Sequence, residues 1–252
     1  MNDTIGWFAM AGFLAQLVDG CLGMAYGVIS STLLISLGVP PAAASASIHA
    51  AEIFTTGASG FFHFKLGNVD KRLLARLILP GILGGVAGAA IVSSLPARIA
   101  GPLVSVYLAV LGAVILSKSF RRKPVGSAGE KHLSALALVG GFLDAVGGGG
   151  WGPIVTSTMV ARGHHPRFTI GTVNLAEFFV TLSQVFAFSL TIGFTNWRII
   201  AGLIIGGVLA APLSALLCRK ISPTALMRMV GLLIGCISGR MIWKTLIALC
   251  LM

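Results

Sequence analysis

The sequence predicts an all-α integral membrane protein made of two homologous repeats, and three observations lead to this prediction. The 252 residues are 56% hydrophobic and only 10% charged, and their mean hydropathy is +0.95. A soluble domain carries about 25% charged residues, so this chain lacks the polar residues to cover a water-soluble surface. Long apolar stretches alternate with short polar breaks, and similar motifs return at an offset of 125 residues. The composition excludes a soluble enzyme, a disordered chain and a nucleic-acid-binding protein.

The net charge of +11 fits the excess of Lys and Arg that holds the loops of a membrane protein on the cytoplasmic side. Four cysteines lie in apolar segments at unrelated spacings: Cys21, Cys218, Cys236 and Cys250. This pattern predicts buried free thiols rather than a metal site or disulfides. The N-terminus carries no basic region, so we do not expect a cleaved signal peptide.

Six stretches have the length of a spanning helix, which needs about 20 apolar residues. They are residues 42–64, 73–95, 99–117, 168–192, 199–218 and 224–244. Each is bounded by a short segment that contains Lys, Arg, Gly or Pro. We expect six plain transmembrane helices at these places.

Two further apolar stretches, residues 5–39 and 133–161, are interrupted by glycine. The first break falls in residues 19–27, and the second contains four consecutive glycines followed by Trp-Gly-Pro. Such runs do not hold a helix in place. The piece before the first break, residues 5–18, would reach roughly 21 Å, short of a hydrocarbon core of about 30 Å. Each stretch is predicted to form two half-helices that meet at a turn near the bilayer midplane.

The chain is predicted to be an internal duplication, with residues 1–120 and 133–252 as the repeats and 121–132 as a basic cytoplasmic loop between them. At an offset of 125 the following pairs align without a gap: Asp19 with Asp144, Gly23 with Gly148, Tyr26 with Trp151, Ser47 with Thr172, His49 with Asn174 and Glu52 with Glu177. Each repeat would hold one broken stretch and three plain spans.

The orientation of the repeats depends on whether the broken stretches cross the membrane. If they are re-entrant, the repeats are inverted and one side of the membrane carries 13 Lys and Arg in its loops, against two on the other. If they cross, eight spans form parallel repeats and the charges are divided more evenly. The positive-inside rule favours the inverted arrangement, with the N-terminus in the periplasm, and leaves eight spans as the alternative.

The glycine-rich breaks are the predicted substrate site. A half-helix that begins inside the membrane presents unpaired backbone N–H groups and the positive end of its dipole, which together attract an anion. Glycines at such a start let a ligand approach the main chain, although they also allow close packing of helices. On this basis Gly147, Gly148, Gly149, Gly150 and Gly23 are candidate substrate-binding residues.

Four of the seven acidic residues lie in apolar segments as two repeat-related pairs. An ionised carboxylate inside a membrane costs at least about 2.5 kcal/mol, so it needs a partner, a proton or a function. We expect Glu52 and Glu177 to couple transport to protons. Asp19 and Asp144 are expected either to cap broken backbone, as Asp does at turns, or to take part in coupling.

Six polar or aromatic residues near the breaks complete the candidate site: Ser47, His49, Thr172, Asn174, Tyr26 and Trp151. Histidine and asparagine stand three residues before the two glutamates and share a helix face with them. The hydroxyl groups could donate to an anion, and the aromatic rings could line the site or fill the gap in the helix. No cluster has the spacing of a metal site, and no cofactor is predicted.

The stretch from Gly141 to Gly150, Gly-Phe-Leu-Asp-Ala-Val followed by four glycines, together with Gly-Thr-Val-Asn at 171–174, resembles the TauE/SafE family of membrane permeases. In the first repeat the motif is degenerate, because Cys21, Leu22, Met24 and Ala25 replace most of the glycines. The resemblance implies export or uptake of sulfite, sulfoacetate or another sulfur-containing organic anion.

We therefore expect a secondary transporter for a small anion in the bacterial inner membrane, working by alternating access around the helix breaks. The expected partners are that anion and the lipid bilayer, with no nucleic acid; a homo-oligomer is left open. A passive anion channel is the main alternative. A membrane-embedded enzyme is not expected, since no catalytic constellation is evident.

Overall fold

The computed structural model describes residues 3–22, 24–120, 132–194, 196–217 and 223–250, and every element in these ranges is a helix. The first repeat contains α1 (Asp3–Leu22), α2 (Tyr26–Ser36), α3 (Pro41–Lys65), α4 (Lys71–Ser94) and α5 (Ala97–Lys118). The second contains α6 (Leu133–Gly147), the π-helical turn η1 (Gly152–Thr156), α7 (Ser157–Ala161), α8 (Pro166–Thr191), α9 (Trp197–Leu217) and α10 (Pro223–Cys250). The predicted all-α fold class is confirmed.

Long helices lie at the six predicted spans, and many large apolar side chains on them face outward, as in a protein surrounded by lipid. Three helices in the described part of the chain are long and apolar enough to cross a membrane: Lys71–Ser94, Ala97–Lys118 and Arg167–Thr191. The last helix continues beyond the predicted end at residue 244, because residues 245–250 remain apolar. Cys236 is a free thiol, but it is exposed rather than buried as predicted.

Both helix breaks are present. Between α6 and η1, Gly148 and Gly149 have φ angles of +69° and +159°, which favour glycine. The first break begins later than predicted, since α1 continues through Gly20 to Leu22 instead of ending near Val18. A single glycine costs a helix only about 1 kcal/mol, which does not stop it by itself.

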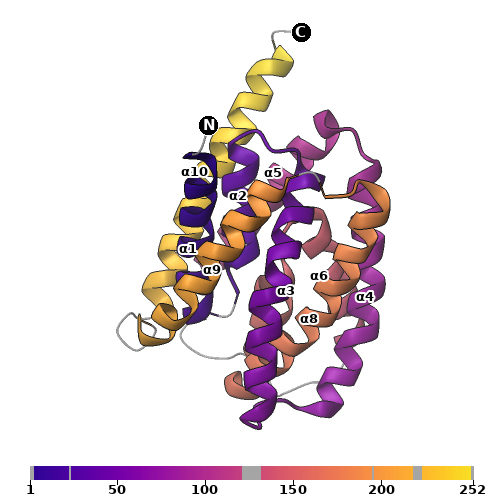
Figure 1. Cartoon of the computed structure of the whole chain (residues 1–252), viewed down its shortest axis with the longest axis vertical. Coiled ribbons are helices and arrows are strands. Elements are labelled where there is room, and N and C mark those ends of the chain that lie inside the picture. Colours follow the sequence, from indigo (N-terminus) through magenta and orange to yellow (C-terminus); the bar gives the residue numbers. More distant parts are fainter. Residues whose placement is uncertain (1–2, 23, 121–131, 195, 218–222, 251–252) are drawn as a thin grey trace.

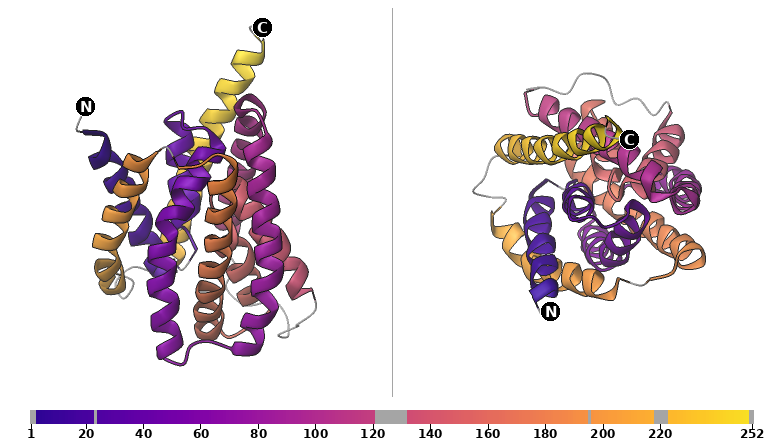
Figure 2. Two further views of the ribbon diagram at one scale, coloured as in Figure 1. Left: turned by 45° about the vertical axis from the view of Figure 1, so that its right-hand side comes forward. Right: turned by 90° about the horizontal axis from the view of Figure 1, so that it is seen from above.

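The closest helix pairs join the two repeats to each other. Helix α1 packs on α9 and α6 packs on α4, while α3 packs on α8 and α5 on α10 (Figure 2). Under the 125-residue offset, the first two pairs are counterparts of each other, and the last two each join a helix to its own counterpart. This pairing is the one expected from a two-fold relation between the predicted repeats. Small residues permit the close approach, because a Cβ on Gly84 would collide with the backbone of Leu138 in α6.

The course of the chain makes each broken helix a hairpin. In Figure 1 both termini lie toward the upper end, and the turn between α3 and α4 lies at the lower end. Helix α2 leads into the top of α3, so α1 and α2 enter and leave at the upper end. Helices alternate in direction from there, so α6 and α7 enter and leave at the lower end. The two breaks meet between these ends.

Candidate functional site

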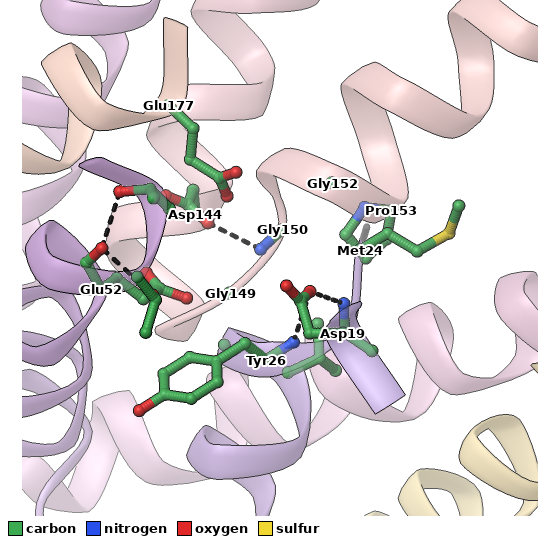
Figure 3. A pocket seen from close by; sticks show the side chains of 15 residues that line it. Asp19, Met24, Tyr26, Glu52, Asp144, Gly149, Gly150, Gly152, Pro153 and Glu177 are labelled. Carbon is green, nitrogen blue, oxygen red and sulfur yellow. Dashed lines mark hydrogen bonds between the residues drawn. The ribbon is translucent and has the colours of Figure 1, made fainter. Parts of the chain in front are cut away.

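A small pocket, with a cavity volume of about 20 Å³, lies where the two helix breaks meet. Its walls include residues 24–28 from the first break and Gly149, Gly150, Gly152 and Pro153 from the second. All four repeat-related carboxylates line it: Asp19, Glu52, Asp144 and Glu177 (Figure 3). The four acids that are paired by the sequence repeat therefore share one pocket.

The two breaks touch through glycine backbone. A Cβ on Gly27 would lie 2.7 Å from the carbonyl oxygen of Gly148 and from the Cα of Gly149. A Cβ on Gly149 would collide with the backbone of Gly27 and Val28. Glycine is required at this crossing for close packing. Gly27 and Gly149 also line the pocket, so Gly149 fits both roles considered for the glycines, packing of the breaks and lining of the site.

Asp19 and Asp144 cap the second half-helices in the same way. Asp19 Oδ1 accepts hydrogen bonds from the backbone N–H groups of Ala25 at 2.7 Å and Tyr26 at 3.1 Å. Asp144 Oδ1 accepts from Gly150 at 2.8 Å and Trp151 at 3.0 Å. Each carboxylate therefore reaches forward six and seven residues and satisfies two N–H groups at the start of a helix.

Asp144 has two further partners on other helices. Its Oδ2 lies 3.1 Å from His49 Nε2 on α3 and 3.1 Å from Gln184 Nε2 on α8. Gln184 also donates to the carbonyl oxygen of Gly141 at 3.2 Å. Because α3 belongs to the first repeat, the His49–Asp144 contact joins the repeats. His49 was predicted as a substrate ligand, but it lies fully buried behind Asp144 and is not part of the pocket wall.

The two glutamates face the pocket with few partners. Glu52 is 4% exposed, and its Oε2 has no hydrogen-bond partner among the described residues. Its backbone carbonyl accepts from the hydroxyl groups of Thr55 and Thr56, which also line the pocket. Glu177 is half-buried on α8. The pocket wall contains no Lys or Arg in the described part of the chain.

The aromatic residues of the two breaks support the backbone. Tyr26 lines the pocket and its hydroxyl donates to the carbonyl oxygen of Leu203 at 3.2 Å. Trp151 is fully buried, and its indole N–H donates to the carbonyl oxygen of Val173 at 3.2 Å. Trp151 belongs to the apolar core between α4, α6 and α8 and lies outside the pocket wall.

Several other predicted residues lie away from this pocket. Thr172 accepts a hydrogen bond from the backbone N–H of Asp70 at the start of α4, and Asn174 donates to the carbonyl oxygen of Ile170 one turn earlier. Ser47 bonds to Ala43 in its own helix. Gly147 packs against the ring of Tyr107, and Gly148 against Ser31 and Ser45. Gly23 lies outside the described residues.

Three polar residues at the second break were missed by the sequence analysis. The hydroxyl of Tyr107 donates to the carbonyl oxygen of Gly149 at 3.0 Å, and Gln184 donates to Asp144. Lys118 donates to the carbonyl oxygen of Pro153 at 3.3 Å and to Ser157. Tyr107 and Gln184 could have been found as isolated polar groups in apolar spans, whereas Lys118 looked like a loop residue.

Comparisons with known proteins identify the family of this chain. The family described as "Sulfite exporter TauE/SafE" matches residues 8–241. The chain is 43% identical over 239 residues to the "Probable membrane transporter protein YtnM" of Bacillus subtilis (strain 168), covering 90% of this chain and 78% of that protein. No solved structure matches. The resemblance seen in the glycine-rich motif is thereby confirmed, and the chain belongs to the TauE/SafE family of membrane transporters.

Proposed function

We propose that this transporter moves a small anion, sulfite or an organosulfonate such as sulfoacetate, together with protons across the inner membrane. The observation that carries the proposal is the pocket between the two breaks, where two half-helix N-termini and two glutamates meet. The family description names sulfite. The pocket supports a small oxyanion because it combines main-chain donors with limited space.

The anion would be held by backbone N–H groups. The first N–H groups of a helix have no partner within the helix, and the dipole adds positive charge there. Asp19 and Asp144 already occupy the first donors of each half-helix. The next residues along, Gly27 and Gly152, line the pocket, and their lack of a side chain leaves the main chain open to a ligand.

The glutamates make the binding of an anion depend on protons. An anion about 5 Å from an ionised carboxylate would be repelled by roughly 3 kcal/mol at an effective dielectric constant of about 20. Two such carboxylates, Glu52 and Glu177, line the pocket without a Lys or Arg in its described wall. Both must be protonated when the anion is bound, so the anion and protons travel together.

Glu177→Gln is expected to remove proton coupling while preserving the site, because glutamine mimics the protonated acid. Uptake of sulfite driven by a proton gradient should fall at least about tenfold, as expected when a proton-transferring group is lost. Exchange of sulfite at equal pH on both sides of a proteoliposome should change much less. The flux of labelled sulfite in the two modes measures this difference.

Asp70→Asn is the matched control, since Asp70 is an exposed carboxylate that caps α4 and asparagine caps equally well. This variant should behave as the wild type in both modes. Equal losses of gradient-driven uptake and exchange in Glu177→Gln would refute the coupling role. Full flux without any pH dependence would favour a passive channel.

Alternating access would follow from rocking of one repeat against the other, as in transporters built from inverted repeats. The hairpin course of both broken helices and the lower-end position of the α3–α4 turn support that orientation. Single cysteines at Leu37 and His165, exposed positions that follow the two hairpins, test it in a cysteine-free background. We expect Leu37→Cys to react with an impermeant thiol reagent from the periplasm and His165→Cys only from the cytoplasm. Labelling of both from one side would restore eight spans.

A further inference from the structure

We propose that His49 and Asp144 form a proton-binding site that joins the two repeats. The site lies directly behind the pocket wall, on the side of Asp144 opposite to the helix cap that it forms. The existence of the site follows from hydrogen-bond geometry alone. Its part in transport rests on the proton-coupled function proposed above.

The contacts of His49 Nδ1 show that this nitrogen carries a hydrogen. This nitrogen lies 2.7 Å from the carbonyl oxygen of Ser45, which can only accept. The Ser45 hydroxyl lies 3.2 Å away, but it donates its hydrogen to the carbonyl oxygen of Ala145 at 2.6 Å. Nδ1 therefore faces two acceptors and must carry a hydrogen.

The other ring nitrogen of His49 contacts the carboxylate of Asp144. His49 Nε2 lies 3.1 Å from Asp144 Oδ2. If Nδ1 carries the only hydrogen, the lone pair of Nε2 faces the lone pairs of a carboxylate, which is repulsive. A second proton on this pair removes the repulsion. The three other hydrogen bonds that Asp144 accepts, from Gly150, Trp151 and Gln184, stabilise its ionised form and place that proton on the imidazole.

Several titratable side chains surround the His49–Asp144 pair and would sense the charge of this proton. On α3, Glu52 Oε2 lies 4.0 Å from His49 Nε2, and it faces the pocket. From α8, Gln184 bonds Asp144 and the ring of Phe188 packs 6.1 Å from the imidazole. Asp19 from α1, Tyr26 from α2 and Glu177 from α8 complete the titratable groups around the pocket, and Tyr107 from α5 contacts the second break.

The pair links the proton to the movement of the repeats. His49 belongs to the first repeat and Asp144 to the second, so the charged contact holds α3 against α6. Asp144 also caps the second half-helix through Gly150 and Trp151. Loss of the proton would leave a buried carboxylate facing a nitrogen lone pair, and the interface between the repeats and the start of the half-helix would loosen together.

The position equivalent to His49 in the second repeat does not provide such a proton site. Asn174, the counterpart of His49, donates to Ile170 in its own helix. An amide cannot take up a proton in this way. Because the second repeat has asparagine at the equivalent position, His49→Asn is a well-matched substitution. It removes the proton site while retaining a polar side chain of moderate size.

The decisive measurement is nitrogen NMR of protein in lipid nanodiscs at neutral pH, with 15N in the histidine rings. The other four histidines (His63, His132, His164 and His165) are replaced by asparagine, so that the signal of His49 needs no further assignment. We expect both ring nitrogens of His49 to carry a hydrogen. One bare ring nitrogen would overturn the proton site, and this result would leave anion transport itself untouched.

Transport then tests the coupling. Sulfite uptake is measured against external pH in the single-histidine protein and in His49→Asn. If one titrating proton is lost, the rise of flux with acidity should flatten by up to about tenfold per pH unit. An unchanged pH profile in His49→Asn would overturn the coupling role. If the wild type moves no sulfite, the proposed substrate fails, while the NMR result still decides the proton site.

Discussion

Replacing Gly149 by valine is expected to abolish transport and to leave little folded protein. The backbone at Gly149 has a φ angle of +159°, and a Cβ there would collide with main-chain atoms of Gly27 and Val28. A β-branched residue adds backbone strain to overpacking, for a total cost of about 2–6 kcal/mol. This cost is a large fraction of the stability of an ordinary protein. The yield of monodisperse protein in detergent and the flux of sulfite measure the two losses.

Gly193→Val separates backbone strain from collision. Gly193 has a φ angle of +66°, but nothing lies within 4 Å of a Cβ built there. This variant should lose some stability and keep its place in the membrane and most of its transport. Wild-type yield and affinity in Gly149→Val would contradict the direct contact between the two breaks.

Much of the fold could be predicted from the sequence because membrane helices follow from length and hydropathy. The four glycines and the proline that follows required a break at the second site, and the structure has α6 and η1 on either side of it. The end of α1 could not be placed. It depends on Asp19, which remains in the helix and reaches forward to cap Ala25 and Tyr26. Such a partner is a matter of three-dimensional contact rather than local pattern.

The part of the candidate site that could be predicted from the sequence is the set of acidic residues that recur in both repeats. Repeat-related carboxylates in apolar segments identified Asp19, Glu52, Asp144 and Glu177, and all four line one pocket. The duplication did not predict which neighbours share the pocket. Each residue turns a helix by about 100°, so Glu52 faces the pocket while Ser47 on the same helix bonds to its own backbone.

The alignment of the two repeats did not predict that the two helix breaks have different side-chain partners. His49 and Asn174 occupy equivalent positions, yet only His49 reaches a carboxylate of the other repeat in the described contacts. Tyr107 and Lys118 likewise support the second break through the carbonyl oxygens of Gly149 and Pro153. Sequence equivalence predicts equivalent backbone, whereas the partners of each side chain depend on the neighbouring helices.

This asymmetry leads to a second large expected effect, which compares the two aspartates. Asp144→Asn should lower sulfite transport at least about thirtyfold, corresponding to a loss of about 2 kcal/mol or more. The carboxylate accepts two backbone N–H groups on Oδ1 and donors from His49 and Gln184 on Oδ2. An asparagine has only one acceptor oxygen. Its NH₂ group would therefore point its hydrogens at the donors that now bond either Oδ1 or Oδ2, which is repulsive.

Asp19→Asn is the matched variant, and we expect it to retain most of its transport. Both N–H groups that Asp19 caps bond to the same oxygen, Oδ1, which the carbonyl of asparagine can replace. Flux in proteoliposomes and melting temperature in detergent, measured for both variants, compare the two breaks directly. Equal effects would mean that the helix cap alone gives each aspartate its importance. A selective loss in Asp144→Asn would mean that its Oδ2 contacts with His49 and Gln184 do, because the cap is the feature that the two aspartates share.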